Sequence, residues 1–189
     1  MKKLASVILL IAIVLSTNSC FGGFIYDNSR QIAKKQIESV LDAIQNKDKE
    51  KLTSLFSKNI LGELQSYDES VDALFDYFNG SVESFDDDFS LLVEGFEEDG
   101  FFGKFMISKF DVKTDVCDYY FAMRYVTEGN ENDVGITSLS IIKASEYDDS
   151  EYIYSGDSKY TPGIHIAAQR AEDRYPEIHM AVQKADRYA

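Results

Sequence analysis

Basic residues are scarce in this sequence, and their scarcity excludes one class of function. The 189 residues include 19 Lys or Arg against 33 Asp or Glu, which gives a formal net charge of −14 at pH 7. A protein with this balance repels the phosphates of nucleic acids and anionic lipid surfaces. We therefore exclude nucleic acid as a partner.

Cysteine and histidine are also rare, with two of each. A catalytic thiol needs a neighbour that raises its thiolate fraction, usually a histidine, and both histidines lie far along the chain from Cys117. His165 and His179 have no cysteine nearby, so they do not form a recognisable metal-ligand pattern. We expect no metal or other cofactor, and we expect Cys117 to be a small buried apolar residue.

Long apolar runs are absent apart from residues 4–15, which contain a single Ser and follow Lys2 and Lys3. This run is too short for a comfortable membrane span of roughly 20 residues. A short basic region followed by a short apolar region is typical of a secretory signal. An uncleaved N-terminal anchor helix is the alternative. Tryptophan is absent, but 12 Tyr and 13 Phe supply bulk for the core of one domain in the rest of the chain.

Polar residues 16–19 (Ser-Thr-Asn-Ser) follow this run, and Cys20 comes directly after the small residue Ser19. The region resembles a bacterial lipoprotein signal, in which such a cysteine receives a diacylglyceryl group and becomes the new N-terminus. Residues 22–23 (Gly-Gly) fit a flexible tether, whereas residues 17–18 (Thr-Asn) depart from the Leu and small residue of the pattern. The resemblance implies lipidation of Cys20 and a location on the extracytoplasmic face of the cell membrane, because two acyl chains anchor a protein stably. Cys117 is then left without a disulfide partner.

Three amphipathic helices are expected at the start of the remaining chain. Asn28 and Gln31 have the spacing of a capping box and predict a helix from 28 to about 46. Asp48 predicts the start of a second helix, and Ser66 with Glu69 the start of a third that ends before residues 79–80 (Asn-Gly). Apolar residues recur on one face of each helix, and we interpret these stripes as core.

From Ser81 onward the pattern changes to short runs rich in Phe, Tyr, Ile and Val, which predict strands at 81–86, 104–113, 116–127, 134–144, 150–154 and 163–167. The third strand is partly apolar on both faces, so we expect it at the centre of the sheet, covered on both sides. The polar residues 129–133 predict a hairpin turn. Helices followed by antiparallel strands are typical of an α+β fold.

Four stretches carry a family resemblance: IESVLDAIQNKDKEKLTSLFSKN, DALFDYFNGSVESFD, DVGITSLSIIKA and TPGIHI. They resemble a family of small Gram-positive lipoproteins with an uncharacterised domain. More remotely, the chain is similar to the nuclear-transport-factor-2-like and cystatin-like superfamily, whose curved antiparallel sheet wraps a long helix into a cone with a cavity. The resemblance implies a signal peptide at 1–19, a tether at 20–27 and an α+β domain at 28–166. The chain departs from the family after Ile166, where an Ala-rich segment predicts an extra helical tail at 167–189. It supplies no catalytic residues.

The acidic residues are unevenly distributed. Between Lys58 and Lys104 there are 13 Asp or Glu and no Lys or Arg, including the runs at 86–88 and 97–99. A solvated acidic loop is the first interpretation. Calcium binding and attraction of a basic partner are the alternatives. An EF-hand counted from Asp86 fails, because its sixth residue is Leu91 where the loop needs Gly.

We predict a non-catalytic binding or interaction module at the cell surface, with an unknown small ligand or protein partner and a possible homodimer. The ligand is expected in the concavity between the first helix and the sheet. Core packing would equally explain the residues expected there, which are Ile37, Leu41, Phe75, Tyr119, Phe121 and Tyr125. One alternative is a ketosteroid-isomerase-like enzyme with a cavity carboxylate, such as Asp76 beside Tyr77 or Asp118 beside Tyr119 and Tyr120. The other alternative is a structural envelope protein.

Overall fold

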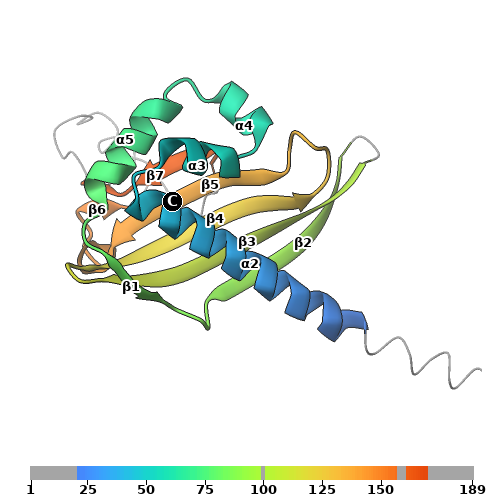
Figure 1. Ribbon diagram of the computed structural model, residues 1–189, viewed down its shortest axis with the longest axis horizontal. Coiled ribbons are helices and arrows are strands. Elements are labelled where there is room, and N and C mark those ends of the chain that lie inside the picture. The colour runs from blue at the N-terminus through green and yellow to red at the C-terminus, as the bar shows by residue number, and fades with distance from the viewer. Residues whose placement is uncertain (1–20, 99–100, 157–160, 170–189) are drawn as a thin grey trace, which may run out of the picture.

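A computed structural model describes residues 21–98, 101–156 and 161–169 of the chain. Its helices come mainly before its strands, which agrees with the expected order (Figure 1). The helices are α2 (Phe21–Gln45), α3 (Lys49–Leu55), α4 (Lys58–Glu63), α5 (Tyr67–Tyr77) and α6 (Ala144–Tyr147). The strands are β1 (Val82–Phe85), β2 (Ser90–Glu98), β3 (Phe101–Thr114), β4 (Asp118–Glu128), β5 (Gly135–Lys143), β6 (Tyr152–Ile153), β7 (Gly163–Ile166) and β8 (Ala168–Gln169).

Among the described residues, six strands form one curved, open sheet with the order β1-β3-β4-β5-β7, and β2 also pairs with β3. Strands β1 and β2 follow one another along the same edge of β3, because β1 pairs with residues 112–114 and β2 with residues 101–109. Every pair is antiparallel except β5 with β7, which is parallel. The sheet is therefore mixed, and the expectation of a wholly antiparallel sheet is wrong at this edge. The chain passes through α6 and β6 before β7, and such a crossover returns it in the direction of β5.

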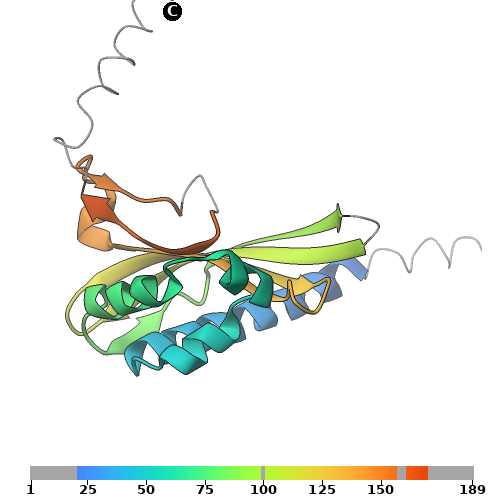
Figure 2. The same ribbon diagram turned by 90° about the horizontal axis from the view of Figure 1, so that it is seen from above.

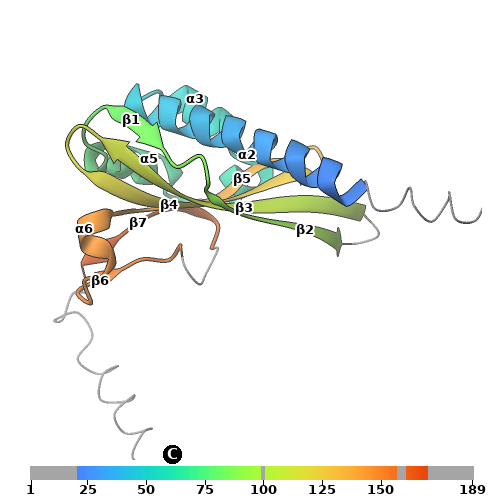
Figure 3. The same cartoon turned by 90° about the horizontal axis from the view of Figure 1, so that it is seen from below.

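The two faces of the sheet have different coverings. Helices α2, α3 and α5 lie against one face, which we call the inner face (Figure 2). Helix α6 and strand β6 lie on the opposite, outer face at one end of the molecule (Figure 3). Strand β4 is central, as the two apolar faces of its sequence predicted.

Aromatic and aliphatic side chains fill the space between the helices and the inner face. Alternate residues of β4 point toward the helices. These are Tyr119, Phe121, Met123 and Tyr125, and each is at most 1% exposed. Phe121 stacks on Phe110 of β3 with 5.2 Å between ring centroids. Burying this apolar surface is the main favourable contribution to folding.

One of the three expected helix starts differs from the structure, and a second lacks its expected capping hydrogen bond. Helix α2 begins at Phe21, so Asn28 lies inside it and the expected capping box there is wrong. The segment expected as a tether, residues 20–27, overlaps the helix from Phe21 onward. No proline interrupts α2, and two glycines in a helix cost only about 1 kcal/mol each, so helical hydrogen bonding can continue toward the N-terminus. Ser66 precedes α5 as expected, but its side chain makes no capping hydrogen bond.

The start of the second helix agrees with the prediction. The side chain of Asp48 accepts a hydrogen bond from the backbone N–H of Lys51 at 2.9 Å, and α3 follows it. This satisfies one of the orphan donors of the first helical turn.

The strand predictions are confirmed for five of the elements, with shifted ends, and for β6 in a shorter form. Strand β2 was missed because the acidic run hid its alternation. Leu91 and Val93 pack against the core, while Glu94 and the exposed Leu92 lie on the other face. The short helices α4 and α6 were also missed. The helical tail expected from residue 167 lies outside the described residues beyond 169, and residues 168–169 within it form strand β8.

Candidate functional site

The six residues expected to line a cavity all lie in the hydrophobic core. Their exposed fractions run from 0% to 7%, and they form part of one continuous cluster between the helices and the inner face. The structure thus places Ile37, Leu41, Phe75, Tyr119, Phe121 and Tyr125 in one buried cluster. The alternative that core packing explains them matches this burial. Ligand binding among them stays a prediction.

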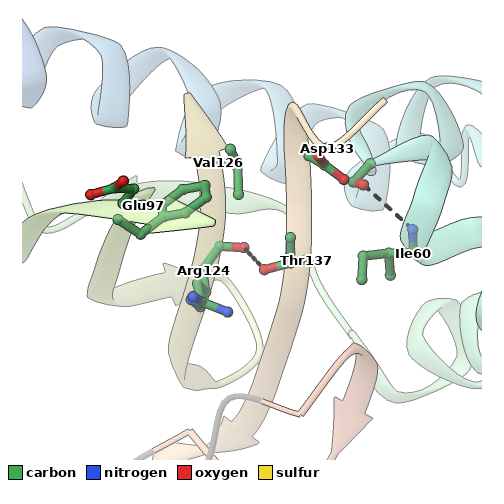
Figure 4. Close-up of a pocket in the computed structure, with 8 residues that line it drawn as sticks. Ile60, Glu97, Arg124, Val126, Asp133 and Thr137 are labelled. Atoms are coloured by element: carbon green, nitrogen blue, oxygen red, sulfur yellow. Dashed lines mark hydrogen bonds between the residues drawn. The ribbon is translucent and has the colours of Figure 1, made fainter. Parts of the chain in front are cut away.

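A pocket of about 460 Å³ lies elsewhere, near one end of β4 and β5. This volume is within the usual range for small-molecule sites. Figure 4 shows Glu97, Val126 and Arg124 on one side of it and Ile60 and Asp133 on the other, with Thr137 between them. We call it the outer pocket, and its full lining is Ser57, Ile60, Phe96, Glu97, Arg124, Val126, Asp133 and Thr137.

An irregularity in the β4–β5 ladder shapes the centre of the outer pocket. Arg124 pairs with Ser138 and the next residue, Tyr125, pairs with Ile136, so Thr137 is an extra residue on β5. Such a bulge re-aims the side chains around it. The Thr137 hydroxyl donates a hydrogen bond to the backbone carbonyl of Arg124 at 3.3 Å, which holds the two strands together at this point (Figure 4).

The junction between α3 and α4 forms the opposite wall. The backbone N–H of Ser57 donates to the carbonyl of Ile136 at 3.0 Å, so this junction joins the start of β5. Gly135 makes the close approach possible, because its φ is +131° and a Cβ there would lie 2.6 Å from the Ser57 nitrogen. The Ser57 hydroxyl in turn donates to the carbonyl of Asn132 at 2.9 Å. These contacts fix Ser57 and Ile60 beside the strands.

Arg124 is the unusual residue of the outer pocket. Its side chain is half-buried, and its guanidinium lies over the ring of Phe105 at 4.3 Å from the centroid. Among the described residues its guanidinium forms no salt bridge or hydrogen bond. Of the seven other half-buried cations of the described part, six form a salt bridge with a carboxylate, and the seventh, Lys109, also has an interaction partner. The six are Arg30, Lys34, Lys49, Lys51, Lys104 and Lys143.

A second unpaired group adjoins Arg124. Ser138, its partner across the ladder, is 1% exposed, and its hydroxyl has no hydrogen-bond partner among the described residues. Burying polar groups without partners costs free energy, and a half-buried cation costs more than a neutral group. Sites of this kind are candidates for contact with a ligand.

The acidic run at residues 86–88 is exposed, as expected of a solvated acidic loop, and it also forms ion pairs with cations of α2. Lys34 pairs with Asp87 at 2.6 Å, and Arg30 pairs with Asp88 at 3.2 Å and also donates to the carbonyl of Asp87 at 2.8 Å. The Arg30 guanidinium also lies 4.5 Å from the ring centroid of Phe89. Cations of α2 therefore hold the loop between β1 and β2. In the part of the chain that the structure describes, no group of three or more His, Cys, Asp or Glu is arranged to hold a metal ion.

The two carboxylates named for an isomerase-like site are exposed. Asp76 lies on the outward side of α5, and Asp118 lies at the start of β4. Asp111 is the described carboxylate whose pKa is raised, first by partial burial and then by Asp86 and Asp118. It is an exposed residue of β3 and lines neither the inner core nor the outer pocket.

A tyrosine network links the end of α5 to the sheet. The Tyr77 hydroxyl donates to Glu146 at 2.6 Å and accepts from the backbone N–H of Lys143 at 2.9 Å. The Tyr119 hydroxyl accepts from the backbone N–H of Asn79 at 2.8 Å and donates to the carbonyl of Tyr77 at 3.2 Å. Burial is the main cause that raises the pKa of both phenols, to about 12 for Tyr119. These contacts explain both tyrosines as structural residues.

The rare histidine and cysteine residues have local structural contacts. His165 Nε2 lies 2.8 Å from the carbonyl of Thr161 and 3.0 Å from its hydroxyl. Cys117 is a free, half-buried thiol just before β4, and not within the strand as expected. His179 and Cys20 lie outside the described residues.

A family model matches more than half of the chain. The model describes a domain of unknown function, DUF5104, and it matches residues 39–144. The chain belongs to the DUF5104 family. The matched segment runs from the C-terminal part of α2 to the start of α6 and contains every residue that lines the outer pocket. No curated protein matches the sequence.

The membrane association expected from the N-terminal residues concerns segments outside the described part. Within residues 21–98, 101–156 and 161–169, no helix has both the length and the apolar character that a membrane span requires.

Sequence reasoning missed the outer pocket, although one signal was present. Arg124 is the only basic residue in the strand expected at 116–127, which is otherwise rich in Tyr, Phe, Met and Val. A cation inside a strand expected to be covered on both faces needs a partner, and that expectation points to position 124. The other lining residues come from four separate segments, and only the fold brings them together.

Proposed function

We propose that this DUF5104 protein is a non-catalytic binding module, held on the extracytoplasmic face of the cell membrane by a diacylglyceryl group on Cys20. Its ligand binds in the outer pocket, and the space between α2 and the sheet serves as packed core. The observation that carries the binding role is Arg124, a half-buried cation without a carboxylate partner in a pocket of about 460 Å³.

The packing of the inner face supports this choice over an isomerase-like enzyme. Such an enzyme needs a carboxylate held in a cavity so that its pKa suits proton transfer. The inner face instead presents large apolar side chains, and the carboxylates named for the reaction, Asp76 and Asp118, are exposed to solvent. Tyr77 and Tyr119 are engaged in hydrogen bonds with backbone and side-chain groups.

We further propose that the fold is a member of the nuclear-transport-factor-2-like or cystatin-like group. The curved sheet that packs over the long helix α2 supports this assignment (Figure 3). The filled interior and the parallel strand β7 distinguish the chain from a simple antiparallel cone.

The anchor is tested by mass spectrometry of the protein extracted from membranes of a bacterial host. We expect a mature N-terminus at Cys20 with two acyl chains, and loss of membrane retention in the Cys20→Ser variant. Cys117→Ser is the matched control, because it removes the other thiol and leaves the signal intact. A water-soluble wild-type product, or a Cys20→Ser variant that stays with the membrane, would show that the anchor proposal is wrong.

The binding role is tested on the same material by native mass spectrometry. We expect a small molecule to remain with the wild-type chain and to be lost from Arg124→Gln. Retention of the same molecule by both proteins would place its site elsewhere and contradict a role for the outer pocket.

A further inference from the structure

We infer that the outer pocket binds a ligand with an anionic group, carboxylate or phosphate, next to an apolar group, and that Arg124 contacts the anion. The inference rests on the binding role proposed for this pocket, and it is independent of the lipid on Cys20. It names the chemical class of the ligand, which the family match leaves open.

The position of Arg124 suits recognition of an anion. A guanidinium is planar, always charged, and presents its N–H donors in a fork that matches two oxygens of a carboxylate or phosphate. One flat face of this guanidinium lies over Phe105 at 4.3 Å, which restricts its plane while the N–H groups at its edge stay available. No described carboxylate or carbonyl accepts from them. Charge-assisted hydrogen bonds of this kind are stronger than neutral ones.

The acidic residues of the pocket do not neutralise Arg124. In Figure 4 the carboxylate of Glu97 points away from the guanidinium, and Asp133 lies on the opposite side of the pocket. Asp133 also accepts a hydrogen bond from the side chain of Asn59. The contrast with the cations of α2 and α3 is clear, because Lys34 and Lys49 lie beside aspartates that pair with them.

The other polar side chains of the pocket leave Arg124 as its principal donor. The Ser57 hydroxyl hydrogen is used on the carbonyl of Asn132, and the Thr137 hydroxyl hydrogen on the carbonyl of Arg124. Both hydroxyls are therefore acceptors toward a ligand. An anion bound here has one orientation, with its charge at Arg124.

The apolar part of the ligand follows from the remaining lining. Ile60, Phe96 and Val126 supply aliphatic and aromatic surface, and Phe96 lies 6.3 Å, centroid to centroid, from the ring that supports Arg124. Burial of apolar ligand atoms against this surface contributes affinity, and the cation gives orientation and specificity. A bare inorganic anion would lack the first contribution.

A set of matched probes tests the inference. The probes are 3-phenylpropionate, 3-phenylpropanol and 3-phenylpropylammonium, which share a body and differ in charge, with 2-phenylethyl phosphate as a second anion. The full chain is labelled with ¹⁵N-arginine, and the side-chain signal of Arg124, assigned by its loss in Arg124→Gln, reports binding. We expect the carboxylate or the phosphate to bind about tenfold more tightly than the alcohol, because it gains a charge-assisted hydrogen bond. The tighter of the two anions identifies the source of the charge.

Four variants separate the contributions. Arg124→Gln is expected to remove the preference for the anions, read from the amide signals of ¹⁵N-labelled Thr, which include Thr137. Arg124→Lys keeps the charge without the fork and is expected to retain part of the preference. Glu97→Gln removes a nearby negative charge and is expected to strengthen anion binding about twofold. Lys113→Gln is the matched control, because Lys113 is an exposed cation on the neighbouring strand β3 that does not line the pocket. Its removal should leave all four affinities unchanged.

The outcomes distinguish this inference from the proposed function. If the alcohol or the ammonium probe binds as tightly as the anions, the pocket is a ligand site and the anion assignment is wrong. If none of the four probes shifts the Arg124 signal, the outer pocket is not a ligand site, and the proposed binding role fails with the inference. An anion preference that survives in Arg124→Gln would show that Arg124 does not contact the anion, and would overturn the inference.

Discussion

Replacing Tyr119 by Phe removes one oxygen atom from the interior and breaks two hydrogen bonds. The hydroxyl accepts from the backbone N–H of Asn79 at 2.8 Å and donates to the carbonyl of Tyr77 at 3.2 Å, and the residue is 0% exposed. A backbone donor or acceptor left unpaired in the interior costs about 1–3 kcal/mol. We therefore expect Tyr119→Phe to lower the free energy of unfolding at neutral pH by about 2 kcal/mol.

The pH dependence gives this prediction a second, independent part. Burial is the main cause that raises the pKa of Tyr119 from 10.0 to about 12. The folded state then holds the phenol proton more tightly than the unfolded state, so the stabilising effect is complete below pH 10 and is lost as the pH rises toward 12. A shift of this size corresponds to roughly 2–3 kcal/mol in the wild type. Tyr119→Phe has no proton to lose, so the difference between the two proteins should shrink over this range.

Urea unfolding followed by circular dichroism at pH 7.5 and at several values between 10 and 11.5 measures both parts. Tyr120→Phe is the matched control, because Tyr120 is the next residue, faces the outer side of the sheet and keeps its ring contact with Tyr147 at 4.7 Å. We expect the control to change stability by less than about 0.5 kcal/mol. Equal effects of the two substitutions, or a difference that stays constant up to pH 11.5, would refute the reasoning.

Three further predictions concern the loops and the sheet. Asp111→Asn should stabilise the protein at pH 7 by a few tenths of a kcal/mol, because the fold raises the pKa of Asp111 and so disfavours its charged form. In thermal melts this gain should vanish below about pH 3, where the wild-type carboxyl is protonated in both the folded and the unfolded state. Gly135→Ala should lower the free energy of unfolding by about 3 kcal/mol, because φ at this position is positive and the added Cβ would lie 2.6 Å from the Ser57 backbone nitrogen. Gly62→Ala, at an open helical position, should leave that free energy unchanged or raise it in the same urea assay. Arg30→Gln should speed amide hydrogen exchange at residues 86–88, because it removes the contacts of Arg30 with Asp87 and Asp88. Unchanged exchange there would show that Arg30 does not hold this loop.

The helical half of the fold was readable from the sequence because its signals are local. Apolar residues at helical spacing gave the inward faces of α2, α3 and α5, and Asp48 marked the start of α3 by a hydrogen bond three residues away. The start of α2 was not readable, because Asn28 has the right chemistry for a cap wherever a helix happens to begin. Only the continued backbone hydrogen bonding from Phe21 decides it.

Strand β2 shows why the acidic region was harder to interpret. Its charged residues obscure the alternation of Leu91 and Val93, which pack on the core from the inner face. The loop before it is exposed, as expected of a solvated acidic loop, but its ion pairs could not be predicted because no Lys or Arg lies within the region. Its partners, Arg30 and Lys34, lie more than 50 positions earlier in the chain, and only the packing of α2 across the sheet brings them there.

Local sequence patterns identify some residues of the candidate sites, and long-range contacts are needed to find the others. The six inner residues were identified together because each belongs to an apolar pattern of one helix or strand, and such patterns report burial without reporting function. Arg124 carries the opposite information, because it breaks the apolar pattern of β4, and a half-buried cation without a carboxylate partner is expensive to keep for packing alone. Its ring contact with Phe105 offsets part of that cost and fixes the guanidinium plane, but it cannot saturate the N–H donors. The free energy left to gain at those donors is what an anionic ligand would supply, and this makes Arg124, more than any aromatic residue of the interior, the position where function should be sought first.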